Sequence, residues 1–236
     1  MENSNLISRD GEKIRAVLFD LDGTLVDRAG SLERFLGRQY DRFAIQLRGM
    51  EREIYLRAIT ELDCHGHFPN LEFYTQFQQK FGISSELGQA LLDDFQANFP
   101  SQVIPYPGVH EMLKALSAGS LALGLVTNGS SRSQRAKIEA LGIAGYFGVI
   151  LVSKEQGVRK PDPEIYHRAL QALVSAPSQT IFVGDNPEAD IDGPAKVGLK
   201  TIWKRNGCWP APLQADAIID GLEEVPALIA AWGVTR

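Results

Sequence analysis

The sequence predicts an α/β protein in which a doubly wound, mostly parallel sheet carries an inserted block of helices. Two observations predict this class. Short apolar runs alternate along the chain with segments of helical spacing, as in repeated strand–helix–strand units. One long stretch, residues 28–102, keeps a helical period and contains no strand-like run. With 236 residues, 44% of them hydrophobic, the chain is long enough for one large domain carrying a smaller inserted one.

The strands are predicted from apolar runs that do not alternate with polar residues, a pattern typical of parallel strands buried on both faces. The runs are residues 14–21, 120–130, 147–153, 180–185, 200–207 and, more weakly, 217–220. Helical spacing between them is marked by Val109, Leu113 and Leu116, by Ile138 and Leu141, and by Ile165, Ala169 and Leu173. The order of these segments predicts the doubly wound sheet.

The inserted block is predicted from apolar residues at helical spacing. They are Leu32, Phe35, Leu36, Phe43 and Leu47, then Ile54, Ile59 and Leu62, then Phe73, Phe77 and Phe81, and last Leu87, Leu91, Phe95 and Phe99. We predict an N-cap at Ser31 for the first helix, and caps at Ser84 and Ser85 for the last. The proline-rich residues 99–108 form the return connection. The predicted organisation is therefore a core of residues 1–27 and 103–236 with a helical cap of residues 28–102.

Composition and charge exclude several classes of protein. A net charge of −5 without a basic stripe argues against a nucleic-acid partner. The N-terminal residues are polar, and no run approaches the ~20 apolar residues that span a bilayer, so we expect neither a secretory signal nor a membrane role. Two cysteines far apart in the sequence suggest no disulfide framework, and we expect a cytoplasmic location. The oligomeric state is left open.

Polar side chains follow four of the predicted strands, some directly at the strand end and others, Lys160 and Asp190, in the segment that comes next. Because the carboxyl ends of parallel strands meet at one edge of a sheet, we expect these side chains to converge there. The set comprises Asp20, Asp22, Thr127, Asn128, Lys160, Asp185 and Asp190.

This set has the chemistry of a phosphoryl-transfer site. Carboxylates that lie together repel one another unless a cation binds, and all-oxygen ligands favour Mg²⁺. Thr127, Asn128 and Lys160 supply the hydrogen bonds and the positive charge that a phosphoryl group needs. One of Asp20 and Asp22 can attack phosphorus, and the other can act as general acid and base.

At these residues the sequence resembles the haloacid dehalogenase-like hydrolase superfamily. The matching segments are "DLDGTLVD", "VTNGS", "RKPDPEIY" and "GDNPEADIDGPAKVG", in the family's order. The resemblance implies a Rossmann-like core, and the helical cap after the first segment is similar to the phosphoglycolate phosphatase-like subgroup, which acts on small metabolites. It implies a Mg²⁺-dependent phosphatase whose substrate is a small phosphorylated metabolite.

The resemblance also implies a role for each residue. Asp20 matches the nucleophile, which is phosphorylated during turnover and binds Mg²⁺. Asp22 matches the general acid/base, and its backbone carbonyl matches a metal ligand. Thr127 and Asn128 match the phosphate-binding pair, and Lys160 matches the lysine that steadies nucleophile and phosphate. Asp185 matches the metal-binding acid, whereas Asp190 is expected to hold metal-bound water from outside the ligand set.

Alternative functions remain open on the same residues. Phosphomutases share all four segments, although "DGT" mildly favours hydrolysis. Dehalogenases of this fold do not need the second carboxylate, so the presence of Asp22 counts against them. A non-catalytic phosphate- or metal-binding member is less favoured, because it would be expected to have lost Asp20, Asp22 or Asp185.

Two further groups of residues are weaker candidates. The segment Cys64-His65-Gly66-His67 fits no standard zinc spacing and is better interpreted as a cap loop near the substrate. Arg28, Arg52 and Arg57 are candidates for binding an anionic tail, although charged residues on helices are more often simply solvated. Lys154 is interpreted as a solvated lysine.

Overall fold

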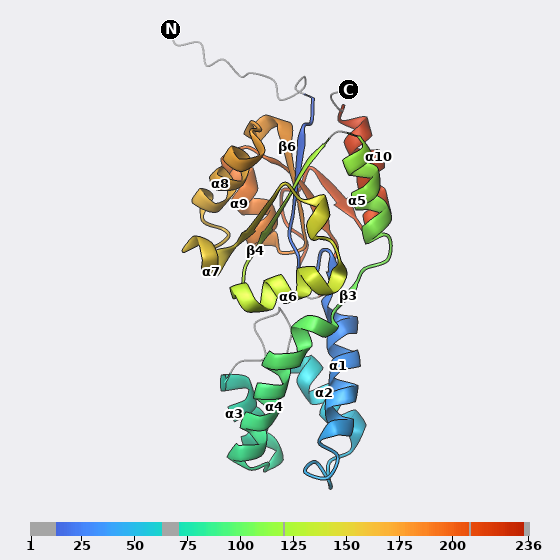
Figure 1. The fold of residues 1–236 in the computed structure, drawn as a ribbon, viewed down its shortest axis with the longest axis vertical. Helices are drawn as coiled ribbons and strands as arrows, with labels where there is room; N and C mark the ends of the chain where they lie inside the picture. The colour runs from blue at the N-terminus through green and yellow to red at the C-terminus, as the bar shows by residue number, and fades with distance from the viewer. Residues whose placement is uncertain (1–12, 63–70, 120, 208, 234–236) are drawn as a thin grey trace.

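The computed structural model describes residues 13–62, 71–119, 121–207 and 209–233, and within them it contains a six-stranded parallel sheet flanked by helices (Figure 1). The strand order is β5-β4-β1-β6-β7-β8, which places the first strand in the middle of the sheet. The strands are β1 (Ala16–Phe19), β4 (Ala122–Thr127), β5 (Val149–Val152), β6 (Thr180–Gly184), β7 (Lys200–Lys204) and β8 (Ala217–Ile219). Each lies within one of the predicted runs, so the predicted fold class is confirmed.

The helices that accompany this sheet follow the strands in alternation. They are α5 (Val109–Ala118), α6 (Ser131–Leu141), α7 (Ser153–Gln156), α8 (Pro163–Leu173), α9 (Gly193–Val197) and α10 (Val225–Ala231), with short 3₁₀ or π turns at η2 (Ala144–Tyr146), η3 (Pro177–Gln179), η4 (Pro187–Asp192) and η5 (Leu222–Glu224). The predicted helical segments at 109–116, 138–141 and 165–173 lie in α5, α6 and α8.

The two faces of the sheet bury different sets of side chains, because successive residues of a strand point to opposite faces. In β1, Val17 and Phe19 belong to one apolar cluster and Leu18 to the other. In β6, Phe182 packs in the same cluster as Leu18. This two-sided burial explains why the strand sequences are continuous apolar runs.

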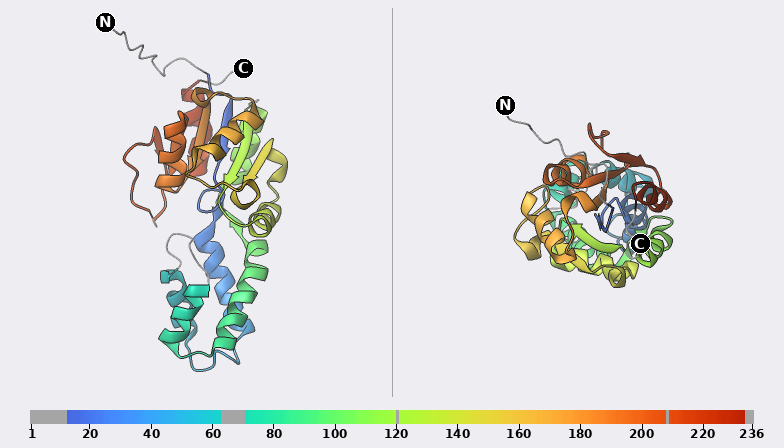
Figure 2. Two further views of the ribbon diagram at one scale, coloured as in Figure 1. Left: turned by 90° about the vertical axis from the view of Figure 1, so that its left-hand side faces the viewer. Right: turned by 90° about the horizontal axis from the view of Figure 1, so that it is seen from above.

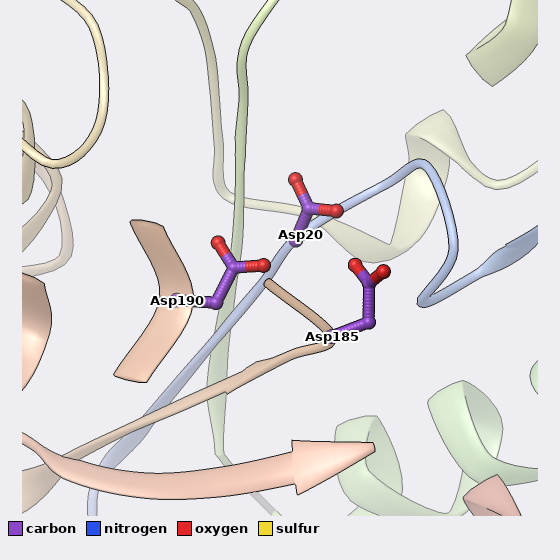
Figure 3. A group of neighbouring side chains, drawn as sticks. All are labelled: Asp20, Asp185 and Asp190. Atoms are coloured by element: carbon purple, nitrogen blue, oxygen red, sulfur yellow. The ribbon is translucent and has the colours of Figure 1, made fainter. Parts of the chain in front are cut away.

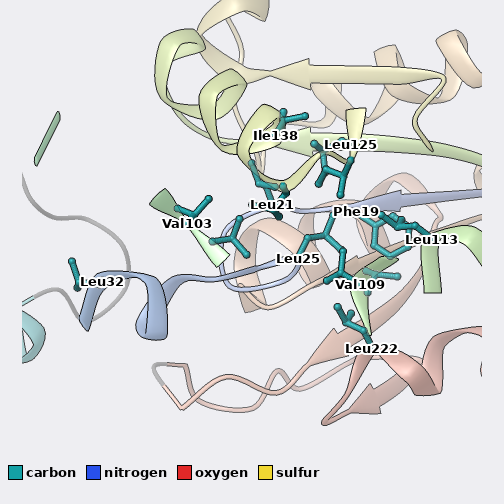
Figure 4. Close-up of a cluster of buried hydrophobic side chains, with 14 of the residues drawn as sticks. Phe19, Leu21, Leu25, Leu32, Val103, Val109, Leu113, Leu125, Ile138 and Leu222 are labelled. Atoms are coloured by element: carbon teal, nitrogen blue, oxygen red, sulfur yellow. The ribbon is translucent and has the colours of Figure 1, made fainter. Parts of the chain in front are cut away.

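The helical block lies beyond the carboxyl edge of the sheet and makes the molecule elongated (Figures 1 and 2). It contains α1 (Arg28–Arg42), α2 (Arg52–Leu62), α3 (Leu71–Phe81) and α4 (Ser85–Asn98), and η1 (Phe99–Gln102) follows. One apolar cluster runs from Phe19 and Leu125 of the sheet past Ile138 of α6 to Leu32 of α1 (Figure 4). The base of the block therefore shares buried apolar surface with the core.

Two local features differ from the prediction. Ser31 is not the N-cap of α1: the cap is Asp27, whose carboxylate accepts from the Gly30 N–H, and Ser31 lies inside the helix. The Ser31 hydroxyl instead accepts from the backbone N–H of Ile104 at 2.9 Å, so its polar group serves a tertiary contact. The predicted cap at Ser84 is confirmed by its hydrogen bond with the Leu87 N–H, and Ser85 is the first helical residue.

Ser31 and Ile104 lie where the chain enters and leaves the helical block. There β2 (Val26–Asp27) and β3 (Ile104–Pro105) form a two-residue antiparallel ladder that the apolar pattern does not predict. This ladder joins the two connections side by side. Within the described residues, no helix is both long and apolar enough to cross a bilayer.

Candidate active site

Three buried aspartates meet at the carboxyl edge of the sheet (Figure 3). Asp20 directly follows β1, Asp185 directly follows β6, and Asp190 lies in the turn η4. Strands β1 and β6 are parallel neighbours, so their ends lie side by side. One carboxylate oxygen of each aspartate lies within 4.8 Å of those of the other two, which is a spacing that suits a single bound cation.

Hydrogen bonds and ion pairs hold this cluster. The ammonium group of Lys160 lies 2.6 Å from Asp20 Oδ1 and 2.7 Å from Asp190 Oδ1, and the Lys160 side chain is only 2% exposed. Asp185 accepts from the Asn206 side-chain amide at 2.7 Å and from the Thr24 hydroxyl at 3.3 Å. One lysine thus partly offsets the charge of three carboxylates.

Burial and mutual repulsion shift the titration of this cluster. Burial raises the pKa of Asp20 well above its usual range, and the charges of Asp190 and Asp185 add to the rise that Lys160 opposes. Burial, followed by the charge of Asp190, raises the pKa of Asp185 to about 7. Burial alone would lower the pKa of Lys160, but Asp190 and Asp20 outweigh it and raise that pKa. The cluster therefore carries a deficit of positive charge.

The turn after β1 brings the backbone close to this cluster. Gly23 has a φ of +83°, and a Cβ atom at this position would lie 2.4 Å from Asp185 Oδ2. A side chain here would meet both backbone strain and a carboxylate. The glycine of the "DGT" segment is therefore required by the packing of the turn after β1 against Asp185.

Asp22 lies apart from the three clustered carboxylates, and helix α6 holds its side chain. The Lys137 ammonium group lies 2.7 Å from both carboxylate oxygens, and the Gln134 amide donates to Oδ2 at 2.9 Å. Burial would raise the pKa of Asp22, but Lys137 and then Arg28 outweigh this effect and lower it. Asp22 is therefore held in its ionised form.

The predicted phosphate-binding residues Thr127 and Asn128 also form hydrogen bonds within the protein. Thr127 is 1% exposed, and its hydroxyl accepts from the Gln134 side-chain amide at 2.6 Å. The Asn128 side chain makes two 3.0 Å hydrogen bonds with the backbone of Lys160, one in each direction. Asn128 therefore fixes the loop that carries the lysine, and Gln134 links Thr127 to Asp22.

A cavity of about 1010 Å³ opens over these residues between the sheet edge and the helical block. Asp20, Asp22, Asn128, Lys160, Asp185 and Asp190 line it, and Thr127 does not. From the helical block, Arg28, Ala29, Phe95, Gln96, Phe99 and Pro100 contribute to the wall. The cavity brings the predicted catalytic residues into contact with a space that a small molecule can fill.

The three arginines that were candidates for binding an anionic tail lie in three different places in the structure. Arg28 lines the main cavity. Arg52 lines a smaller groove of about 360 Å³ on the helical block and lies 3.8 Å from Asp41. Arg57 is exposed on α2 and lines neither. The segment Cys64-His65-Gly66-His67 lies outside the described residues.

Three site residues were missed by sequence reasoning: Gln134, Lys137 and Asn206. Gln134 carried a signal, because it precedes Ile138 by four residues and so lies on the apolar stripe of its helix. A polar residue on a buried face needs a partner. Lys137 carried the same signal, because it precedes Leu141 by four residues. Asn206 carried no comparable signal, because nothing local marks an asparagine as the partner of an aspartate far away in the sequence.

Comparison with known proteins shows which family and which proteins this chain resembles. Residues 17–204 match the family model described as haloacid dehalogenase-like hydrolase. A ribulose-1,5-bisphosphate 5-phosphatase from Halopiger xanaduensis is 32% identical over 79% of this chain and 83% of its own. The human N-acylneuraminate-9-phosphatase is 29% identical over 92% of this chain and 94% of its own. Among solved structures, a 2-haloacid dehalogenase from Pseudomonas syringae pv. Tomato is 27% identical, with a TM-score of 0.60 over 93% of this chain and all of its own.

Proposed function

The chain belongs to the haloacid dehalogenase-like hydrolase family, and from this premise we propose that it is a Mg²⁺-dependent phosphatase of small phosphorylated metabolites. Phosphoric monoester hydrolysis is the enzyme class that its curated relatives support. The observation that carries the proposal is the buried cluster of Asp20, Asp185 and Asp190 around Lys160, at the floor of a cavity. The cytoplasmic location stays a prediction.

The residues of this cluster fit a magnesium ion. The possible ligand atoms are all carboxylate oxygens, which Mg²⁺ prefers. The pKa values of Asp20 and Asp185 are raised because their buried negative charges are not fully balanced, and a bound cation would balance them. We propose that Asp20, Asp185 and the backbone carbonyl of Asp22 hold the ion, with Asp190 supporting it from outside the ligand set. When bound, the ion would neutralise charge on the phosphoryl group and on the carboxylates.

The remaining chemistry falls to the side chains of the chain itself. In the proposed reaction the Asp20 carboxylate attacks phosphorus, the bond from phosphorus to the leaving oxygen breaks, and Asp22 in its acid form gives that oxygen a proton, so that an alcohol leaves and an aspartyl phosphate forms on Asp20. Lys160, 2.6 Å from Asp20, lies where it can stabilise charge on the phosphoryl oxygens. Asp22 then accepts a proton from the water that hydrolyses the intermediate.

The contacts of Asp22 suit that second step better than the first. As long as Lys137 lies against both of its oxygens, Asp22 is a base. Protonating the leaving alcohol requires a proton on Asp22, so the ion pair must loosen when the substrate binds. In the proposed cycle, the contacts of Lys137 and Gln134 with Asp22 therefore favour its basic form and oppose its acid form.

The test is phosphate release from a panel of phosphorylated metabolites, measured with Mg²⁺ and with a chelator. We expect release that needs Mg²⁺ and that Asp20→Asn abolishes, because an amide cannot take the place of the attacking carboxylate. The matched control is Asp192→Asn, which changes an exposed aspartate that does not line the cavity and should retain activity.

Three other outcomes would contradict the proposal. Equal release with Mg²⁺ and with chelator would exclude the metal-dependent mechanism. Release by the Asp20→Asn variant would exclude this nucleophile. No release of phosphate, combined with transfer of the phosphoryl group between two positions of a sugar, would identify a phosphomutase instead.

A further inference from the structure

The cavity has an uneven distribution of charge across the edge of the sheet. Its only carboxylates among the described lining residues are Asp20, Asp22, Asp185 and Asp190. Asp185 and Asp190 follow β6, on one side of β1. The other side of β1, where β4 and β5 end, contributes no lining carboxylate in the described part of the chain.

Three cations line the cavity on that second side. Arg132 lies in the first turn of α6, after β4, while Lys154 in α7 and Arg159 in the next loop both follow β5. Arg159 is adjacent in sequence to Lys160, whose ammonium group contacts the nucleophile Asp20. All three residues are exposed, so their charges are available to a molecule in the cavity.

Among the described residues, the other two positively charged core residues that line the cavity, Lys160 and Lys137, already form ion pairs. Lys160 pairs with Asp20 and Asp190, and Lys137 pairs with Asp22. Arg132, Lys154 and Arg159 differ from them because, within the described residues, none forms an ion pair. Glu155, beside Lys154, does not line the cavity and lies 2.7 Å from Arg135. Three unneutralised cations thus share one wall.

We propose that Arg132, Lys154 and Arg159 bind a second anionic group of the substrate, a carboxylate or a second phosphate, while the hydrolysed phosphoryl group lies at Asp20. This inference rests on the proposed phosphatase function and names its substrate class. Guanidinium groups bind carboxylate and phosphate oxygens through paired hydrogen bonds, which favours an anion over a hydroxyl group at this wall. A cavity of about 1010 Å³ has room for both ends of such a molecule.

The experiment compares matched pairs of substrates that differ in the second anion. 3-Phosphoglycerate and glyceraldehyde 3-phosphate test a carboxylate, and fructose 1,6-bisphosphate and fructose 6-phosphate test a second phosphate. We expect kcat/KM to be at least about tenfold higher for the anionic member of one pair, as one charge-assisted hydrogen bond allows. In Arg159→Gln and in Arg132→Gln this ratio should fall several-fold, mainly through a higher KM.

A matched control separates this effect from the overall charge of the protein. Arg48→Gln removes an exposed arginine that does not line the cavity, and it should leave the ratio unchanged. If the three cations only attract the phosphoryl group from a distance, both members of each pair would lose activity equally, and the proposal would be wrong. A ratio near one for both pairs in the wild-type protein would also overturn it.

The proposed phosphatase function fails by a different result. In that case neither member of any pair, nor the uncharged-tail substrate p-nitrophenyl phosphate, would release phosphate with Mg²⁺. Hydrolysis of p-nitrophenyl phosphate that depends on Asp20, without any preference for the anionic members, would keep the phosphatase and refute only the second anion site.

Discussion

Replacing Asp185 by asparagine should stabilise the metal-free protein at alkaline pH, although the residue is a proposed ligand. Burial raises the pKa of Asp185 from its ordinary value of 3.8 to about 7, so the folded protein binds a proton that the unfolded chain has already released. The free energy of unfolding therefore decreases as pH rises from about 4 to about 7, and the full penalty persists above pH 7. Asparagine keeps the size of the side chain and removes the charge.

The magnitude follows from the difference of about three pKa units. Each unit corresponds to about 1.4 kcal/mol, so the ceiling above pH 7 is about 4 kcal/mol. Between pH 5 and pH 8 the penalty grows by about 3 kcal/mol at most, because part of it is already present at pH 5. Removing the charge of Asp185 also lowers the pKa of Asp20, which changes the stability in the same direction.

The assay is urea unfolding with a chelator at pH 5 and pH 8, for the wild type and for Asp185→Asn. The variant should gain stability relative to the wild type on going to pH 8, by up to about 3 kcal/mol. Mg²⁺ should stabilise the wild type at pH 8, by about 2.7 kcal/mol at one hundred times its dissociation constant, and should stabilise the variant much less.

The exposed Asp192→Asn variant is the control for any general effect of charge. It should show no relative gain between the two pH values. A variant of Asp185 that is equally stable relative to the wild type at pH 5 and pH 8 would refute the reasoning. That result would mean that the carboxylate cluster is not under electrostatic strain without a cation.

Two further substitutions test the surroundings of the cluster. Lys137→Met should raise the pKa of Asp22, because Lys137 is the main charge that lowers it, and should move the acidic limb of the pH–rate profile of phosphate release to higher pH. Lys137→Arg keeps the positive charge and should leave most of the limb in place. An unchanged profile in the methionine variant would exclude this role of Lys137. Gly184→Ala should weaken Mg²⁺ binding, measured by calorimetry, at least tenfold, because the new Cβ would lie 2.3 Å from Asp190 Cβ. The control Gly145→Ala places a Cβ with nothing within 4 Å and should bind Mg²⁺ normally. Equal affinities in the two variants would refute the effect of this close packing.

The order of strands and helices was predictable because it depends on local patterns. A parallel strand buried on both faces leaves a continuous apolar run, and all six runs contain the observed strands. The same logic placed Asp20 and Asp185 directly after β1 and β6, since polar residues end a buried strand. The prediction extended only to a shared edge of the sheet, and these two carboxylates meet because β1 and β6 pair side by side, which only the structure shows.

Other features depend on contacts that no local pattern encodes. Ser31 has the sequence context of an N-cap, but the chain entering the helical block places Asp27 there and directs Ser31 to Ile104. Thr127 is a predicted phosphate-binding residue, and its hydroxyl also accepts a hydrogen bond from Gln134, which leaves its own O–H free to donate. In both cases a residue with a plausible local role has a tertiary partner.

By itself, the sequence determined the fold class and the convergence of Asp20 and Asp185 at one edge of the sheet, because both follow from which residues end which strands. The structure decided that Asp190 joins these two carboxylates and that the Asp22 side chain lies apart. Only the tertiary structure decided that Lys137 binds Asp22, over a separation of 115 residues. It alone gathered Arg132, Lys154 and Arg159 on one wall of the cavity. The physical reason is that a strand end is defined by its neighbours in the chain, whereas the partner of a charge is defined by whichever distant helix or loop the packing brings against it.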